Sequence, residues 1–275
     1  MSLRERIGLD LGTQFSIREG VEWAAEHDVH YVDICLDETD LDPEAYDGDR
    51  ADEIRSICEQ HDVHLGLHTL SSVNVAETSP IVGDAVVDYL QAYVDIAERV
   101  GAEWLVVHGG YHQSYGFDPG VDARIETAID RIENLATYAE GTGVRILLEN
   151  HNKEPPEAEM HYIPTTLEET QRYFSALSPA VGWAFNPPHA NLQPDGIFGF
   201  IDALDVSRCG EVRLNDNRGE EEEHLRLGEG NIDFEALMER LETEEGYDGH
   251  YTIAVGTPED MLEDREFLLE AAGAE

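Results

Sequence analysis

The stretch Trp104-Leu105-Val106-Val107-His108 is four apolar residues followed by a histidine, and this pattern recurs along the chain. It returns as LGLH in residues 65–68, as ILLE in 146–149 and, with amide or acidic ends, in 181–186 and 212–216. Apolar runs of this length are typical of buried strands. If such strands run parallel around a barrel, their C-terminal ends meet at one open face, where (β/α)8 enzymes carry their catalytic residues. The pattern therefore predicts a parallel barrel with a functional site at that face.

Eight such runs divide the chain into repeats of about 35 residues, as expected for a (β/α)8 barrel. They are Ile7–Leu11, Tyr31–Cys35, His64–His68, Trp104–His108, Arg145–Glu149, Val181–Phe185, Val212–Asn215 and Tyr251–Val255. Between them, apolar residues recur every three to four positions, as in 81–100 and 125–138, which predicts helices. An open doubly wound sheet is the alternative, but it would not place ligand-type residues at five consecutive strand ends. We therefore predict an α/β fold, a single (β/α)8 TIM barrel, with residues 1–275 as one domain.

The charge of the chain is strongly acidic. There are 60 Asp and Glu residues against 17 Lys and Arg, a net charge of -43, and Lys153 is the one lysine. Such a charge destabilises a compact chain by self-repulsion, which molar salt screens because the Debye length falls to about 3 Å. The composition is typical of proteins from salt-accumulating halophiles. An acidic disordered chain is the alternative, but the acids are spread throughout and 41% of the residues are hydrophobic.

The sequence gives no sign of export or membrane insertion. Its N-terminus lacks an apolar signal segment, and no run approaches the roughly 18 apolar residues that a membrane span needs. Cys35, Cys58 and Cys209 form no CxxC pair and are expected to be buried free thiols. We expect a soluble, cytoplasmic protein.

Three potential metal ligands end consecutive strands of the predicted barrel. His68, His108 and Glu149 close the third, fourth and fifth runs. Two imidazoles and a carboxylate form a suitable set for Zn, Mn or Fe. A lone histidine at a strand end is usually structural, but the joint occurrence favours a site.

The order of the segments is similar to that of the xylose isomerase-like barrel superfamily of sugar isomerases and epimerases, which also contains endonuclease IV. The resemblance covers nearly the whole chain. Its most specific part is the stretch from Glu222 to Asp233, with the pattern acid-x-His-x-x-x-Gly-Glu-Gly-x-Ile-Asp. The segments at 65–68 and 148–151 resemble the superfamily as well.

The resemblance implies a metal position that this chain has altered. The isomerases hold one catalytic metal with a glutamate on strand five, an aspartate on six, a histidine on seven and a glutamate on eight. Glu149 matches the first, but Asn186 and Arg213 replace the next two, and Ala254 or Val255 stands at the last. Because arginine keeps its proton and has no acceptor, we expect that position to be empty.

The positions that resemble the other endonuclease metals survive better. His68, His108 and Glu149 match one ligand set, and His189, Glu222 and His224 match another, with glutamate for aspartate. Two alternatives stay open for cofactors: one divalent metal ion (Zn, Mn or Mg), or an inherited scaffold without metal.

The function that the resemblance implies is a sugar or sugar phosphate isomerase or epimerase, which removes a proton next to a carbonyl. Glu149 is the expected base, Arg213 the charge that stabilises the enediolate, and His189 a group that orients a substrate hydroxyl. Other expected substrate contacts are Asn186, Asp216, Trp183 and Tyr111. We expect one mouth of the barrel to be lined by His68, His108, Glu149, Asn186, His189, Arg213, Asp216 and His224.

Two other functions remain open. The lost ligands are compatible with a non-catalytic or metal-free barrel that binds a small molecule. A DNA repair enzyme of the endonuclease IV kind is less favoured, because the loops near the site offer few cations to meet phosphates, namely Lys153, Arg218 and Arg226. The expected partner is a small carbohydrate-like substrate, with no membrane. The sequence leaves the oligomeric state open, including a homo-oligomer.

Overall fold

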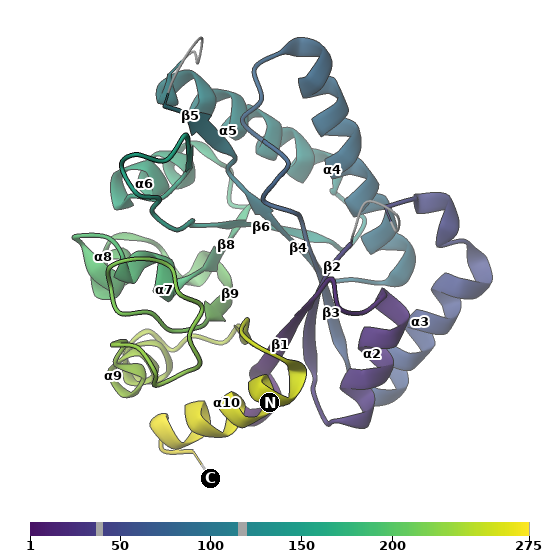
Figure 1. Ribbon diagram of the computed structural model, residues 1–275. Helices are drawn as coiled ribbons and strands as arrows, with labels where there is room; N and C mark the ends of the chain where they lie inside the picture. Colours follow the sequence, from purple (N-terminus) through teal and green to yellow (C-terminus); the bar gives the residue numbers. More distant parts are fainter. Residues whose placement is uncertain (37–40, 115–119, 275) are drawn as a thin grey trace.

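A computed structural model describes residues 1–36, 41–114 and 120–274, and in it eight parallel strands close into a barrel (Figure 1). The strands are hydrogen-bonded in the order β1-β10-β9-β8-β6-β4-β3-β2. Their bounds are β1 Ile7–Gly12, β2 Tyr31–Cys35, β3 His64–His68, β4 Trp104–His108, β6 Arg145–Glu149, β8 Gly182–Phe185, β9 Cys209–Leu214 and β10 His250–Ile253. The predicted (β/α)8 TIM barrel is therefore confirmed.

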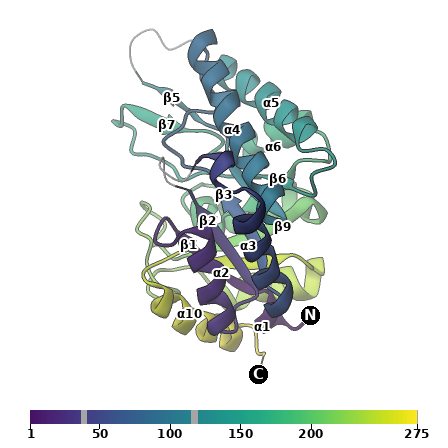
Figure 2. The same ribbon diagram turned by 90° about the vertical axis from the view of Figure 1, so that its right-hand side faces the viewer.

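Helices cover the outside of the barrel (Figures 1 and 2). They are α1 Leu3–Arg6, α2 Ile17–Glu26, α3 Gly48–His61, α4 Pro80–Val100, α5 Val121–Tyr138, α6 Leu167–Ala176, α7 Pro187–Asn191, α8 Gly196–Ala203, α9 Phe234–Met238 and α10 Pro258–Ala271. Short 3-10 turns lie at Pro43–Ala45 and Val206–Arg208, and a π-helical turn at Glu239–Glu245 continues α9. Ser16, Thr166 and Thr257 begin α2, α6 and α10 with capping boxes, which satisfy two backbone N–H groups at each start.

The apolar core has two parts. The larger part lies between strands and helices and takes alternate strand residues such as Leu105, Val107 and Leu148. The smaller part fills the inside of the barrel with Trp104, Val106, Leu147 and Ala184. Because successive side chains of a strand point to opposite faces, the two sets come from the same strands.

Two loops at the C-terminal face of the barrel pair with each other. β5 (Tyr111–Gln113) follows β4, β7 (Met160–Tyr162) follows β6, and the two form an antiparallel sheet in which Tyr111 pairs with Tyr162. We call this pair of strands the arm (Figure 2).

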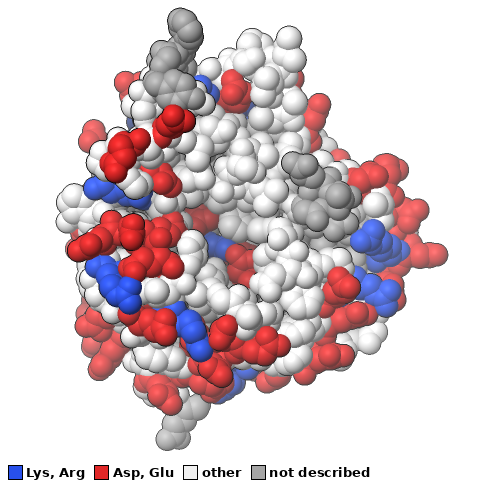
Figure 3. All heavy atoms as spheres, in the orientation of Figure 1, with Lys and Arg blue, Asp and Glu red and all other residues white. Residues whose placement is uncertain are grey.

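Acidic side chains are spread over the face of the molecule that Figure 3 shows, among fewer basic ones. Cys35, Cys58 and Cys209 are free, as expected, but only Cys209 is buried, whereas Cys35 and Cys58 are partly exposed. None of the helices in the described part of the chain combines the length and the apolar character needed to cross a membrane.

Candidate functional site

A cavity of about 590 Å³ opens at the C-terminal ends of the strands. Its size is in the range of small-molecule sites. Of the residues predicted to form the site, it is lined by His68, His108, Glu149, Asn186, His189, Arg213, Glu222 and His224. Further lining residues include Asp10, Gln14, Cys35, Ser71, His151, Asn152, Glu154, Tyr162 and Asn215. The walls are thus rich in hydrogen-bonding groups.

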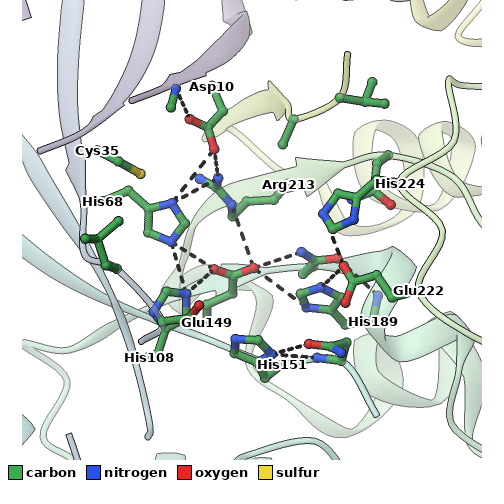
Figure 4. Close-up of a pocket in the computed structure, with 18 of the residues that line it drawn as sticks. Asp10, Cys35, His68, His108, Glu149, His151, His189, Arg213, Glu222 and His224 are labelled. Carbon is green, nitrogen blue, oxygen red and sulfur yellow. Dashed lines mark hydrogen bonds and ion pairs between the residues drawn. The ribbon is translucent and has the colours of Figure 1, made fainter. Parts of the chain in front are cut away.

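His68, His108 and Glu149 meet inside this cavity (Figure 4). His68 Nε2 lies 3.2 Å from His108 Nε2 and 3.3 Å from Glu149 Oε2, and His108 Nε2 lies 3.4 Å from the same oxygen. Among the described residues, these three are the one group of His, Cys, Asp and Glu side chains whose ligand atoms all lie within 4.8 Å of one another. We call them the His-His-Glu trio.

The geometry of the trio fits a divalent ion. Ligand atoms around a tetrahedral Zn²⁺, with bonds of about 2.0–2.1 Å, lie roughly 3.3 Å from one another. The three separations in the trio match that spacing. In addition, Glu149 Oε2 is buried and has no hydrogen-bond partner among the described residues. A buried carboxylate oxygen needs a compensating partner, and an ion held by the trio would supply one.

The charge state of Glu149 suits a ligand better than a base. Burial raises its pKa, but the His108 and His68 rings close to its carboxylate and the charge of Arg213 outweigh burial and hold the pKa well below its ordinary value. A carboxylate with so low a proton affinity is a weak general base. The ionised form is the one that a metal ligand needs, and the roles of Glu149 as a base and as a ligand both remain predictions.

Arg213 lies beside the trio and is surrounded by acids. Its Nη1 donates to Asp33 and, at 2.5 Å, to Glu211 Oε1, and its Nη2 donates to Asp10 Oδ2 at 2.5 Å. Its Nε lies 3.8 Å from Glu149 Oε1. The guanidinium is thus next to Glu149, as predicted, but its N–H groups are directed to other carboxylates.

A second group of polar side chains lies on the other side of Glu149. Asn186 caps α7, where its Oδ1 accepts from the His189 backbone N–H at 3.1 Å, and its Nδ2 donates to Glu149 Oε1 at 2.8 Å. His189 Nδ1 donates to the Asn150 carbonyl at 2.7 Å, and its Nε2 lies 2.8 Å from Glu222 Oε1. His224 Nε2 lies 3.3 Å from that same oxygen. The second predicted ligand set therefore gathers around Glu222.

His189, which is buried, and Glu222, which is partly exposed, form an ion pair. Burial lowers the pKa of His189, but the charge of Glu222 outweighs it and raises the pKa above its ordinary value. Burial raises the pKa of Glu222, and His189 reverses this and lowers it. The pair accordingly holds a proton on the imidazole next to the cavity.

Three residues that were predicted to contact substrate lie elsewhere. Trp183 is buried in the core, and its indole N–H donates to Asn150 Oδ1 at 3.2 Å. Tyr111 lies on the arm with its ring edge-on to Tyr162, and it is not among the lining residues. Asp216 is fully buried and accepts backbone N–H groups of the loop that follows β9, including those of Gly228 and Gly230. Its short, buried side chain organises that loop and does not reach the cavity.

Sequence reasoning missed the acids around Arg213. Asp10, Asp33 and Glu211 lie in β1, β2 and β9, and each is the one acidic residue of its strand. An acid within an otherwise apolar strand was the available signal, because a buried carboxylate requires a partner.

Comparisons with known proteins agree with this architecture. Residues 21–271 match the family model described as the xylose isomerase-like TIM barrel. "Uncharacterized protein MJ1311" of Methanocaldococcus jannaschii is 26% identical over 259 residues, which are 93% of this chain and 84% of that relative. "Probable endonuclease 4" of Haloarcula marismortui is 26% identical over 242 residues, which are 81% of this chain and 83% of that relative.

A solved structure of similar shape is the crystal structure of a D-tagatose 3-epimerase-like protein. It has a TM-score of 0.81 and 24% sequence identity, and the match covers 98% of this chain and 97% of that chain. At this identity the likeness shows the fold.

Proposed function

Because the chain belongs to the xylose isomerase-like TIM barrel family, as its motifs predicted, we propose that it is a metal-dependent enzyme of the sugar isomerase or epimerase kind. Its substrate is a small polyhydroxylated carbonyl compound that enters the cavity at the barrel mouth. The observation that carries this proposal is the His-His-Glu trio, whose spacing and unpartnered Glu149 oxygen suit one divalent ion inside a polar cavity.

His68, His108 and Glu149 would hold the ion, and when bound it would polarise a substrate oxygen. The proton transfers fall to the chain's own residues. His189 carries a proton at Nε2, because its Nδ1 is committed to the Asn150 carbonyl and Glu222 raises its pKa. Once that proton has left, the neutral His189 Nε2 is the matching acceptor, and Glu222 beside it holds the ring in place. His189 therefore supplies an acid and a base at the cavity wall, the roles needed to move a proton next to a carbonyl.

Hydrogen exchange from solvent tests this proposal without knowledge of the substrate. The protein, loaded in turn with Zn²⁺, Mn²⁺ or Mg²⁺, is incubated in D₂O with a panel of aldoses, ketoses and their phosphates, and NMR follows deuterium at the carbon next to the carbonyl. We expect exchange with at least one sugar, and a loss of roughly 100-fold or more in His108→Ala and His189→Gln.

His64→Ala is the matched control. His64 begins β3, whereas His68 ends it, so the control removes the same side chain from the opposite end of the barrel. Unchanged exchange in His108→Ala, or no exchange with any sugar by the metal-loaded protein, would contradict the proposal.

A DNA repair nuclease is a second candidate. It is favoured by the relative named "Probable endonuclease 4" and by the gathering of His189 and His224 around Glu222. A duplex that contains one abasic site distinguishes the two functions. Strand cleavage that is lost in His224→Ala would favour the nuclease, and intact DNA beside active sugar exchange would favour the isomerase.

A further inference from the structure

The barrel mouth contains a cation that is part of the chain, the guanidinium of Arg213. Asp10, Asp33 and Glu211 come from β1, β2 and β9, and all three bond to the guanidinium of Arg213. Asp33 and Glu211 have no solvent exposure, and the side chain of Arg213 is 3% exposed. We call these four residues the guanidinium cluster.

The guanidinium cluster gathers three acidic side chains around one arginine. Three carboxylates around one point would be strongly destabilising without a cation, because buried ions need partners. Arg213 supplies that cation permanently, since it does not lose its proton in proteins.

The guanidinium cluster lies near Oε1 of Glu149, the carboxylate oxygen on the side away from His68 and His108. Glu149 Oε1 accepts from Asn186 Nδ2 at 2.8 Å, and the ring nitrogen His189 Nδ1 and the nitrogen Arg213 Nε lie 3.7 and 3.8 Å from it. The backbone N–H of His189 fixes the orientation of the Asn186 amide, because it donates to Oδ1 and so turns the NH₂ group toward Glu149. Oε1 is thus surrounded by N–H groups, whereas Oε2 is unpartnered and faces the two histidines.

We infer that Arg213 is a built-in cation that limits the barrel mouth to one divalent ion per chain, bound on the Oε2 side of Glu149. A second ion on the Oε1 side would meet the Asn186 NH₂ group and the positive charge of Arg213, and like charges a few ångströms apart repel strongly in a poorly solvated site. The second predicted ligand set, around Glu222, does not offer another site for a second ion, because His189 and Glu222 are joined by a direct hydrogen bond. This inference rests on the metal site of the proposed function.

Counting bound ions tests it. The protein is stripped with a chelator in molar KCl and reloaded with Zn²⁺ or Co²⁺. A weak competing chelator then removes loosely held ions before elemental analysis. We expect one ion per chain in the wild type and in Asn186→Ala, and less than about one tenth of an ion in His108→Ala. The visible spectrum of bound Co²⁺ should show one set of bands that Asn186→Ala leaves in place.

The two proposals fail in different ways. Two tightly bound ions in the wild type would overturn the inference and leave the metal site standing. No bound ion would overturn the metal site of the proposed function and the inference with it.

A second experiment removes the guanidinium. Arg213→Met leaves the three acids without their cation, so this variant should bind a second divalent ion, and that ion should raise its melting temperature. The triple variant Arg213→Met, Asp33→Asn, Glu211→Gln should return to one ion. One ion in Arg213→Met, with a melting temperature that metal does not change beyond the wild-type response, would overturn the inference. If Arg213→Met does not fold, the ion counts of the wild type and Asn186→Ala decide the matter.

Discussion

At the scale of single residues, the environment of each side chain decides its role. The sequence indicated His68, His108 and Glu149 because each ends an apolar run, and strand ends share one face of a barrel. It could not indicate that Glu149 is held ionised, because the groups responsible come from β3, β4 and β9. The partners of Arg213 were missed for the same reason: Asp10 and Asp33 are 203 and 180 positions away in the chain.

His250 gives a prediction at this scale. It is buried at the start of β10, and burial lowers its pKa to about 4. The folded protein therefore prefers the neutral ring, whereas the unfolded chain takes up a proton below about pH 6.5. Stability should fall as the pH drops from about 6.5 toward 4, by up to about 3 kcal/mol from this group.

Denaturant unfolding in molar KCl at several pH values measures this effect. His250→Gln should show a shallower loss of stability over that window than the wild type. His61→Gln is the control, because His61 is an exposed histidine in the last turn of α3. Parallel curves for His250→Gln and the wild type would contradict the prediction.

At the scale of elements, apolar runs located the strands well. β2, β3, β4 and β6 have the predicted bounds, because each is a short, mainly apolar run between helices. β9 begins at Cys209, earlier than predicted, because Gly210 and Glu211 break the apolar pattern although they belong to the strand. The arm has no such pattern. Its first strand, Tyr111–Gln113, is held by pairing with Met160–Tyr162, and a contact between segments so far apart in the chain cannot be read from either segment alone.

Gly66 in β3 gives a prediction for an element. A Cβ added there would lie 2.0 Å from the Trp104 ring and 2.4 Å from Asp33 Oδ1. Gly66→Ala should therefore displace the apolar core inside the barrel and lower the free energy of unfolding by about 3 kcal/mol. Gly48→Ala is the matched control, because no atom lies within 4 Å of the Cβ added at Gly48. Equal stability of the two variants in denaturant unfolding would show that the barrel interior is looser than these contacts indicate.

At the scale of the whole molecule, the net charge of -43 is the dominant property. Acidic side chains are spread over the visible face, so their mutual repulsion acts across the molecule (Figure 3). Exposed charges more than a Debye length apart are screened, and that length is about 30 Å at 0.01 M salt and 3 Å at 1 M.

The melting temperature should therefore rise from dilute buffer to molar KCl. A neutral osmolyte at the same osmolarity is the control. It should raise the melting temperature less than KCl does, because it does not screen charges. A melting temperature that stays constant over this range would contradict the halophile interpretation.

The arm joins two loops that the chain order keeps far apart. One of its strands lies in the loop after His108, and the other lies in the loop after Glu149. The Ile163 N–H also donates to the Gly110 carbonyl at 3.0 Å, which adds a second link between the loops. The two loops are therefore mechanically linked, and a shift of either would reach both side chains. An insertion or deletion in one loop is therefore expected to disturb the other unless a second change compensates for it, which is a constraint on how the two segments can evolve.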